Sequence, residues 1–132
     1  MFEEVHMMVN LQTKRIYEPA ESTDGFRILV DRLWPRGISK DAAGLDYWAK
    51  DITPTTQLRE DYHSGIDTWE EFAEKYRAEL LTNPALSDFL NLIHGQKTVT
   101  LLSSVKDAEH SHILVLMEVL KQKLLFKANN SA

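Results

Sequence analysis

The chain of 132 residues has the length of one ordinary domain, and its 43% hydrophobic and 27% charged residues are typical of a soluble globular protein. It contains no cysteine, which excludes disulfides, thiolate zinc sites, iron–sulfur clusters and cysteine nucleophiles. A formal net charge of −5 disfavours general nucleic-acid binding, because proteins that neutralise phosphates usually carry a basic excess. We recognise neither a membrane span nor a signal peptide, so we expect a cytoplasmic protein without a membrane partner.

The first half of the chain predicts two strands separated by a loop. Residues 9–17 alternate between apolar and polar side chains as a strand does, and residues 18–25 have the composition of a loop. Residues 26–30 form a nearly continuous apolar run, which is typical of a strand covered on both faces. After this strand we expect a short helix capped by Ser39, passing into an irregular segment that ends at Pro54.

The second half predicts further helices and one more strand. In chain order these are a helix capped by Thr55 or Thr56, a helix opened by a capping-box-like pair of Asp67 and Glu70, a helix from Pro84 to about His94, a strand over 97–102 and a helix from Asp107 to about Leu125. This order predicts a single-domain α/β layered fold with a mainly parallel sheet flanked by helices. We expect residues 1–132 to form this domain, with 1–8 and 127–132 as flexible tails.

Polar side chains follow both buried strands at the point where each strand ends. In an open parallel sheet, ligands collect beyond the carboxyl ends of the strands, so neighbouring strands would bring these side chains together. The first group comprises Asp31, Arg32 and Arg36, and the second comprises Ser103, Ser104, Lys106, Asp107 and His110. We therefore predict one site for a small anionic ligand, either a phosphate or a nucleotide-like molecule.

The basic residues of this predicted site define its binding role. Arg32, Arg36 and Lys106 would hold the anion, because guanidinium and ammonium groups bind phosphates and carboxylates. Asp31 would orient one of the arginines; alternatively, Asp31 and Arg32 would only pair with each other or with loop backbone.

The hydroxyl, carboxylate and imidazole groups leave more than one interpretation open. Ser103 and Ser104 would contact the ligand or would cap the last helix. Asp107 and His110 lie three residues apart, so a carboxylate on one helical turn would orient an imidazole for proton transfer. The sequence leaves open whether the protein is an enzyme.

Two further hypotheses compete with the anion site. The turn at Trp34 and Pro35 would be an anchor for a protein partner or for a second copy of the chain in a homo-oligomer, making the protein a non-enzymatic interaction module. A metal site at His110 and His112 is disfavoured, since residues two apart on a helix point in different directions. The sequence implies no cofactor.

Five blocks of sequence carry a resemblance to a known family. They are KRIYEP, DGFRILVDRLWPRGISK, WAKDITPTTQLRE, WEEFAEKYRAEL with NPAL after it, and TVTLLSSVKDAEHSHILVL. They run from about Lys14 to Leu120 and resemble the domain of unknown function 488, in its short YeaO-like branch, with VDRLWPRG the most specific block. The resemblance implies a compact α/β domain of bacteria and archaea and no settled biochemical activity.

The second polar group matches the family pattern only in part. Family members usually show a pattern like L-L-Y-A-A-[KR]-D-x-x-H-N, in which Lys106, Asp107 and His110 match while Ser103 and Ser104 depart. The resemblance therefore does not support a serine nucleophile. Longer relatives carry a cysteine–histidine–arginine cluster near His110, and thiol chemistry cannot be carried over to a chain without cysteine.

Overall fold

The computed structural model of the protein describes residues 9–129, with side chains described as far as Leu125, and these residues form an α/β fold around one parallel sheet. The sheet has the order β1-β4-β2-β3, and its strands are β1 (Asn10–Arg15), β2 (Phe26–Leu29), β3 (Tyr47–Trp48) and β4 (Thr98–Ser103). All three strand pairs are parallel. The predicted fold class and the predicted pairing of the two most apolar strands are both confirmed.

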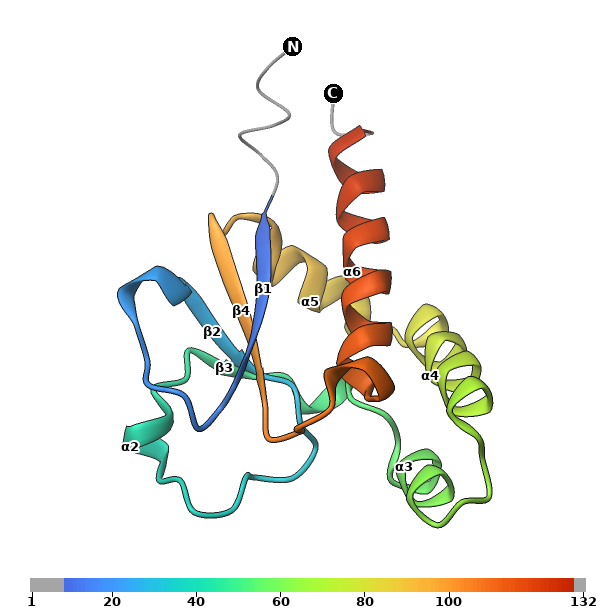
Figure 1. Ribbon diagram of the computed structural model, residues 1–132. Coiled ribbons are helices and arrows are strands. Elements are labelled where there is room, and N and C mark those ends of the chain that lie inside the picture. Colours follow the sequence, from blue (N-terminus) through green and yellow to red (C-terminus); the bar gives the residue numbers. More distant parts are fainter. Residues whose placement is uncertain (1–8, 130–132) are drawn as a thin grey trace.

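Helices cover both faces of the sheet unequally. They are α2 (Lys40–Ala43), α3 (Thr56–His63), α4 (Trp69–Thr82), α5 (Ala85–His94) and α6 (His112–Asn129), with 3₁₀ turns over Ser22–Asp24, Lys50–Ile52 and Ala108–His110. Figure 1 shows α4, α5 and α6 on one side of the sheet and the short α2 on the other. Within residues 9–129, no helix has both the length and the apolar character needed to cross a membrane.

Hydroxyl caps set the starts of three helices, and one of them lies a residue away from its predicted position. Ser39 caps α2 and Thr55 caps α3, each by accepting a hydrogen bond from a backbone N–H three residues on, as expected. The capping box of α4 is formed by Thr68 and Glu71, not by Asp67 and Glu70. Asp67 is instead buried, with its Oδ1 2.8 Å from Lys75 Nζ, so its side chain is not available as the cap.

Three further boundaries differ from the sequence prediction. The strand β3 was not predicted, because two residues are too few to show an alternating pattern. These residues form a strand only by pairing with β2. Asp107 caps the 3₁₀ turn and α6 begins only at His112. The helix α6 runs to Asn129, into the segment 127–132 that we expected to be a tail, while the predicted tail 1–8 and residues 130–132 lie outside the described residues.

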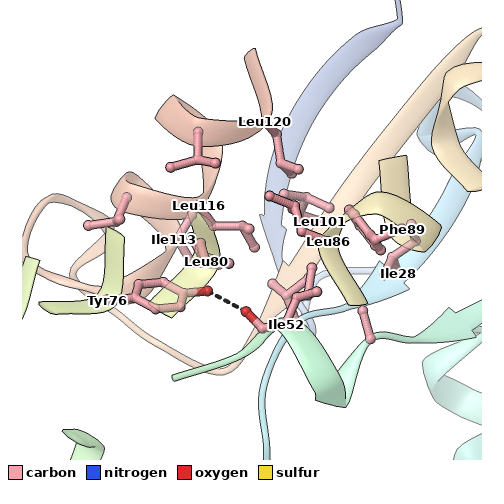
Figure 2. Close-up of a cluster of buried hydrophobic side chains, with 14 of the residues drawn as sticks. Ile28, Ile52, Tyr76, Leu80, Leu86, Phe89, Leu101, Ile113, Leu116 and Leu120 are labelled. Carbon is pink, nitrogen blue, oxygen red and sulfur yellow. Dashed lines mark hydrogen bonds between the residues drawn. The ribbon is translucent and has the colours of Figure 1, made fainter. Parts of the chain in front are cut away.

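The larger core lies between the sheet and α4, α5 and α6. Figure 2 shows Ile28 and Leu101 of the sheet meeting apolar side chains from these helices, and the buried Tyr76 hydroxyl donating to Ile52 O at 2.7 Å. Burying one such aliphatic side chain stabilises the fold by about 1.5–3 kcal/mol. This side of the sheet therefore supplies most of the hydrophobic stabilisation and holds β2 and β4 in fixed register.

The opposite face combines a small apolar cluster around Ile16, Ala43 and Leu102 with an ionic cluster. The ionic cluster, which we call the Asp24 cluster, consists of Lys14, Asp24 and Arg27. The Asp24 carboxylate accepts hydrogen bonds from both basic side chains, and Arg27 also donates to Ala43 O and Gly44 O.

The backbone next to Asp24 is fitted closely against β4. Gly25 has φ of +64°, and a Cβ at this position would lie 2.4 Å from Thr98 O. Thr100 Oγ1 donates to Asp24 O at 2.6 Å. Burial opposes ionisation of Asp24, but the hydrogen bonds from the Glu21 backbone, Lys14 and Arg27 prevail and lower its pKa below the usual value. The cluster therefore fixes the loop that leads into β2.

Candidate functional site

A cavity of about 570 Å³ lies beyond the carboxyl ends of β1, β2 and β4. Its walls come from the ends of these strands, the loops that follow β2 and β4, and side chains of α3 and α4. Seven of the eight predicted site residues line it, namely Asp31, Arg32, Arg36, Ser104, Lys106, Asp107 and His110. They meet here because β2 pairs with β4 in parallel, so that both strands end at the same edge of the sheet.

The Asp31 carboxylate is buried and is held by the last residue of β4 and the first residue after it. Its Oδ1 accepts from Ser103 Oγ at 2.6 Å, and its Oδ2 accepts from Ser104 N at 2.8 Å and Ser104 Oγ at 2.9 Å. The sequence left two roles open for Asp31, orienting an arginine or only pairing with its surroundings, and two for the serines, contacting a ligand or capping a helix. In the structure these three residues bind one another. Sequence reasoning missed this pairing because the carboxylate and the hydroxyls lie more than 70 residues apart.

His112, at the start of α6, completes this arrangement. Its Nε2 lies 2.7 Å from Val30 O, to which it donates, and 3.3 Å from Asp31 Oδ1. Burial opposes ionisation of Asp31, but hydrogen bonds from His112, Ser103 and Ser104 outweigh burial and lower the pKa of this carboxyl. Asp31 therefore carries a charge at neutral pH and joins the ends of β2 and β4 to α6.

Two of the basic side chains that line the cavity are engaged by backbone carbonyls. Arg32 donates from Nε to Pro54 O at 2.8 Å and from Nη2 to Thr53 O at 3.3 Å. Arg15 donates to Ser104 O at 3.1 Å and to Val105 O at 3.3 Å. These arginines hold the cavity walls together while they contribute positive charge.

Three other cations of the cavity have no such partner. Within the described residues, the side chains of Arg36, Arg59 and Lys106 take part in no hydrogen bond or ion pair. The Nε atom of Arg59 is buried and donates to no acceptor. Buried donors in folded proteins almost always have an acceptor, so an unsatisfied one calls for an explanation.

The predicted pair Asp107 and His110 lies on the rim of the cavity. His110 Nδ1 is 3.5 Å from Asp107 Oδ2, and the side chains are 59% and 65% exposed respectively. Asp107 caps the 3₁₀ turn before α6 and His110 is the last residue of that turn, and Tyr62 Oη donates to His110 O at 3.0 Å. The two groups are adjacent, as their spacing predicted, but they face solvent.

The turn after β2 presents only part of its tryptophan to solvent. Trp34 is half-buried, donates from Nε1 to Ile38 O at 2.8 Å and packs edge-to-face on Trp48 with the ring centroids 5.3 Å apart. Pro35 is buried, whereas Leu33 is 62% exposed. Trp34 is therefore partly packed into the fold, and Leu33 is the exposed apolar side chain of this turn.

Sequence reasoning missed Arg15, Tyr17 and Arg59 as cavity residues. Arg15 ends β1 and Tyr17 lies two residues further on, so their place at the same sheet edge could have been inferred from the parallel topology. Arg59 lies on α3, and nothing local in the sequence indicates that α3 approaches the strand ends. Among the described residues, no group of three histidine or acidic side chains could hold a metal ion.

The fold and the cavity define an α/β protein with a parallel sheet and a polar cavity at the strand carboxyl ends. A model of the family described as "Inactive DUF488-N3 subclade" matches residues 10–132. The chain therefore belongs to the DUF488 family, as the VDRLWPRG block and its neighbours indicated.

Two relatives illustrate this membership. The protein of Escherichia coli (strain K12) described as "Uncharacterized protein YeaO" is 46% identical over 113 residues, which cover 86% of this chain and 98% of the relative. An uncharacterized protein of Mycobacterium tuberculosis (strain ATCC 25618 / H37Rv) is 38% identical over 110 residues, covering 83% of this chain and 92% of the relative. No solved structure matches the chain significantly.

Proposed function

We propose that this protein binds a small anionic ligand in the cavity at the strand ends and does not transform it. The observation that carries the proposal is the set of three cationic side chains, Arg36, Arg59 and Lys106, that line one cavity without a partner among the described residues. Guanidinium groups suit phosphate and carboxylate oxygens, and a ligand oxygen would give the buried Arg59 Nε an acceptor.

The distribution of charge supports a small ligand over a long polyanion. Five basic side chains and two carboxylates line the cavity, which is a formal excess of three positive charges with histidine neutral. The whole chain carries −5, so the residues outside the cavity carry −8. Such a field concentrates a small anion in the cavity and repels an extended one such as nucleic acid.

A protein that binds its ligand without converting it agrees with the description of the family. The matching subclade is described as inactive. Asp31, the buried carboxylate of the site, is saturated by Ser103, Ser104 and His112, and so is poorly placed to accept a further proton from a ligand. Asp107 and His110 would then contact the ligand at the rim. A cytoplasmic location, where phosphorylated metabolites are abundant, would suit such a protein.

The test is pyrophosphate binding, measured by thermal shift and by isothermal titration calorimetry on the wild type and two variants. Arg36→Ala removes a charge inside the cavity, and Arg77→Ala removes an exposed charge on α4 that pairs with Glu118. A ligand at 100 times its Kd stabilises the folded state by about 2.7 kcal/mol.

We expect the wild type and Arg77→Ala to bind pyrophosphate alike, and Arg36→Ala to bind at least tenfold more weakly. Raising the salt concentration should weaken binding in all three proteins. Absence of binding by the wild type, or equal binding by Arg36→Ala, would rule the proposal out.

A further inference from the structure

The cavity is larger than a phosphate group requires. Its volume of about 570 Å³ falls within the range of about 300–1,000 Å³ typical of pockets for whole cofactors and drug-sized molecules. Four aromatic side chains line it beside the cations, namely Tyr17, Trp34, Tyr62 and Phe72. A ligand that fills the cavity therefore needs an unsaturated or apolar part in addition to its charge.

Tyr17 is the aromatic side chain best suited to bind that part. It is 44% exposed although it lines the cavity, so its ring is accessible to a ligand. Its hydroxyl donates to Arg36 O at 2.9 Å, and the Arg15 guanidinium lies 5.0 Å from the ring centroid. These two contacts fix the ring before any ligand arrives, which lowers the entropy cost of stacking on it.

The other three rings already pack against aromatic side chains of the protein. Trp34 packs on Trp48, and Tyr62 stacks on Phe72 with centroids 4.5 Å apart and an interplanar angle of 19°. They supply apolar walls, while Tyr17 supplies an exposed face. The hydroxyl bond also places this ring beside the backbone of Arg36, one of the unpartnered cations, so an aromatic group on Tyr17 would lie next to the anion subsite.

The charge of the cavity indicates how many phosphates the ligand carries. A terminal phosphate contributes about −1.5 to −2 near neutral pH, and an inner diester-like phosphate adds one more charge, so a diphosphate carries about −3. This matches the formal excess of +3 contributed by the side chains of the cavity. A monophosphate would leave part of that excess uncompensated.

We propose that the ligand is a nucleoside diphosphate, with its phosphates at Arg36, Arg59 and Lys106 and its base stacked on Tyr17. This inference rests on the proposed anion binding and adds the aromatic half of the ligand and the residue that recognises it. The acidic surface outside the cavity favours a free nucleotide over the phosphorylated end of a nucleic acid.

The experiment compares ADP, AMP, adenosine and pyrophosphate by isothermal titration calorimetry on the wild type, Tyr17→Leu and Tyr17→Phe. Tyr17→Leu removes the ring, and Tyr17→Phe keeps the ring and removes only the bond to Arg36 O. We expect the wild type to bind ADP at least tenfold more tightly than pyrophosphate or AMP, and adenosine not measurably. Circular dichroism confirms that each variant is folded.

The decisive result is how the affinities for ADP and for pyrophosphate change when Tyr17 is replaced. Tyr17→Leu should lower ADP affinity about tenfold and leave pyrophosphate affinity unchanged, since the removed ring would stack on the base and not on the phosphates. Tyr17→Phe should retain most of the preference for ADP. If pyrophosphate binds as tightly as ADP, or if Tyr17→Leu weakens both ligands equally, the nucleotide inference is wrong while anion binding stands. If no phosphate compound binds, both proposals fall.

Discussion

Among the described residues, the basic side chains of the Asp24 cluster and those of the cavity differ in the partners that their charges have. In the Asp24 cluster, Lys14 and Arg27 converge on one carboxylate that is 1% exposed, and the remaining Arg27 donors reach backbone carbonyls. In the cavity, Arg36 and Arg59 have no partner within the described residues. The fold provides partners for the charges of the Asp24 cluster, whereas its described residues provide none for the side chains of Arg36 and Arg59.

This difference distinguishes the arginines that the fold satisfies from those proposed to bind a ligand better than residue type does. Both regions contain arginine beside aspartate, and from sequence alone Asp24 with Arg27 resembles Asp31 with Arg32. In the structure, Asp24 pairs with its nearby arginine, whereas Asp31 pairs with serines and a histidine, and Arg32 turns to backbone oxygens. The hydrogen-bond partners of each buried donor and acceptor therefore distinguish these two kinds of arginine.

The largest effect should come from removing the acid of the satisfied cluster. Arg27 is 5% exposed, and Asp24→Ala leaves its guanidinium without a counter-charge, so we expect a loss of about 3 kcal/mol in the free energy of unfolding. Urea denaturation measures it, with the exposed Glu21→Ala as a control that should change little. The double variant Asp24→Ala with Arg27→Met should recover part of the loss. A loss below about 1 kcal/mol for Asp24→Ala would show that the cluster is not a structural element.

A smaller and pH-dependent effect is expected at Asp31. Its pKa is lowered in the folded protein, because the hydrogen bonds from His112, Ser103 and Ser104 outweigh the opposing effect of burial. Its stabilisation is therefore fully present above the unfolded pKa of about 3.9 and is lost as the pH falls through the lower folded pKa. Asp31→Asn should cost about 2 kcal/mol at pH 7.

The difference in unfolding free energy between the wild type and Asp31→Asn should shrink as the pH is lowered from 5 to 3. Comparing the two proteins isolates Asp31 from Asp24, whose pKa is shifted in the same direction. Urea denaturation at several pH values gives the measurement. A difference that stays constant over this range would mean that the charge of Asp31 contributes nothing.

The smallest effect on stability should come from replacing Arg59, whose buried Nε has no acceptor among the described residues. Arg59→Met keeps the apolar stem and removes a charge and a buried donor without an acceptor, so we expect a change within about 0.5 kcal/mol without ligand. Pyrophosphate should then stabilise this variant less than the wild type. The exposed Arg77→Met is the matched control. A destabilisation comparable to that of Asp24→Ala would place Arg59 among the structural residues and remove the contrast between the regions.

The sequence predicted the sheet and the place of the cavity because both depend on local patterns and on one topological rule. The apolar run before Asp31 and the one before Ser103 identified two buried strands, and parallel pairing brought their ends together. The partners of individual groups were not predictable, since Asp31 and Ser104 are distant in sequence and meet only after folding. Arg59 was missed for the same reason, because its approach depends on how α3 is held.

The position of β4 has a consequence for the order in which the chain folds. It is the last strand in the sequence, yet β1 and β2 both pair with it, and in the described residues β2 has otherwise only the two-residue β3. Contacts between β1 and β4 join residues 88 positions apart, such as Asn10 and Thr98. During synthesis the sheet cannot assemble until Ser103 has left the ribosome, so β1 emerges long before the strand that completes it. Truncation before β4 should therefore leave a chain that does not form the sheet, and with it neither the Asp24 cluster nor the cavity.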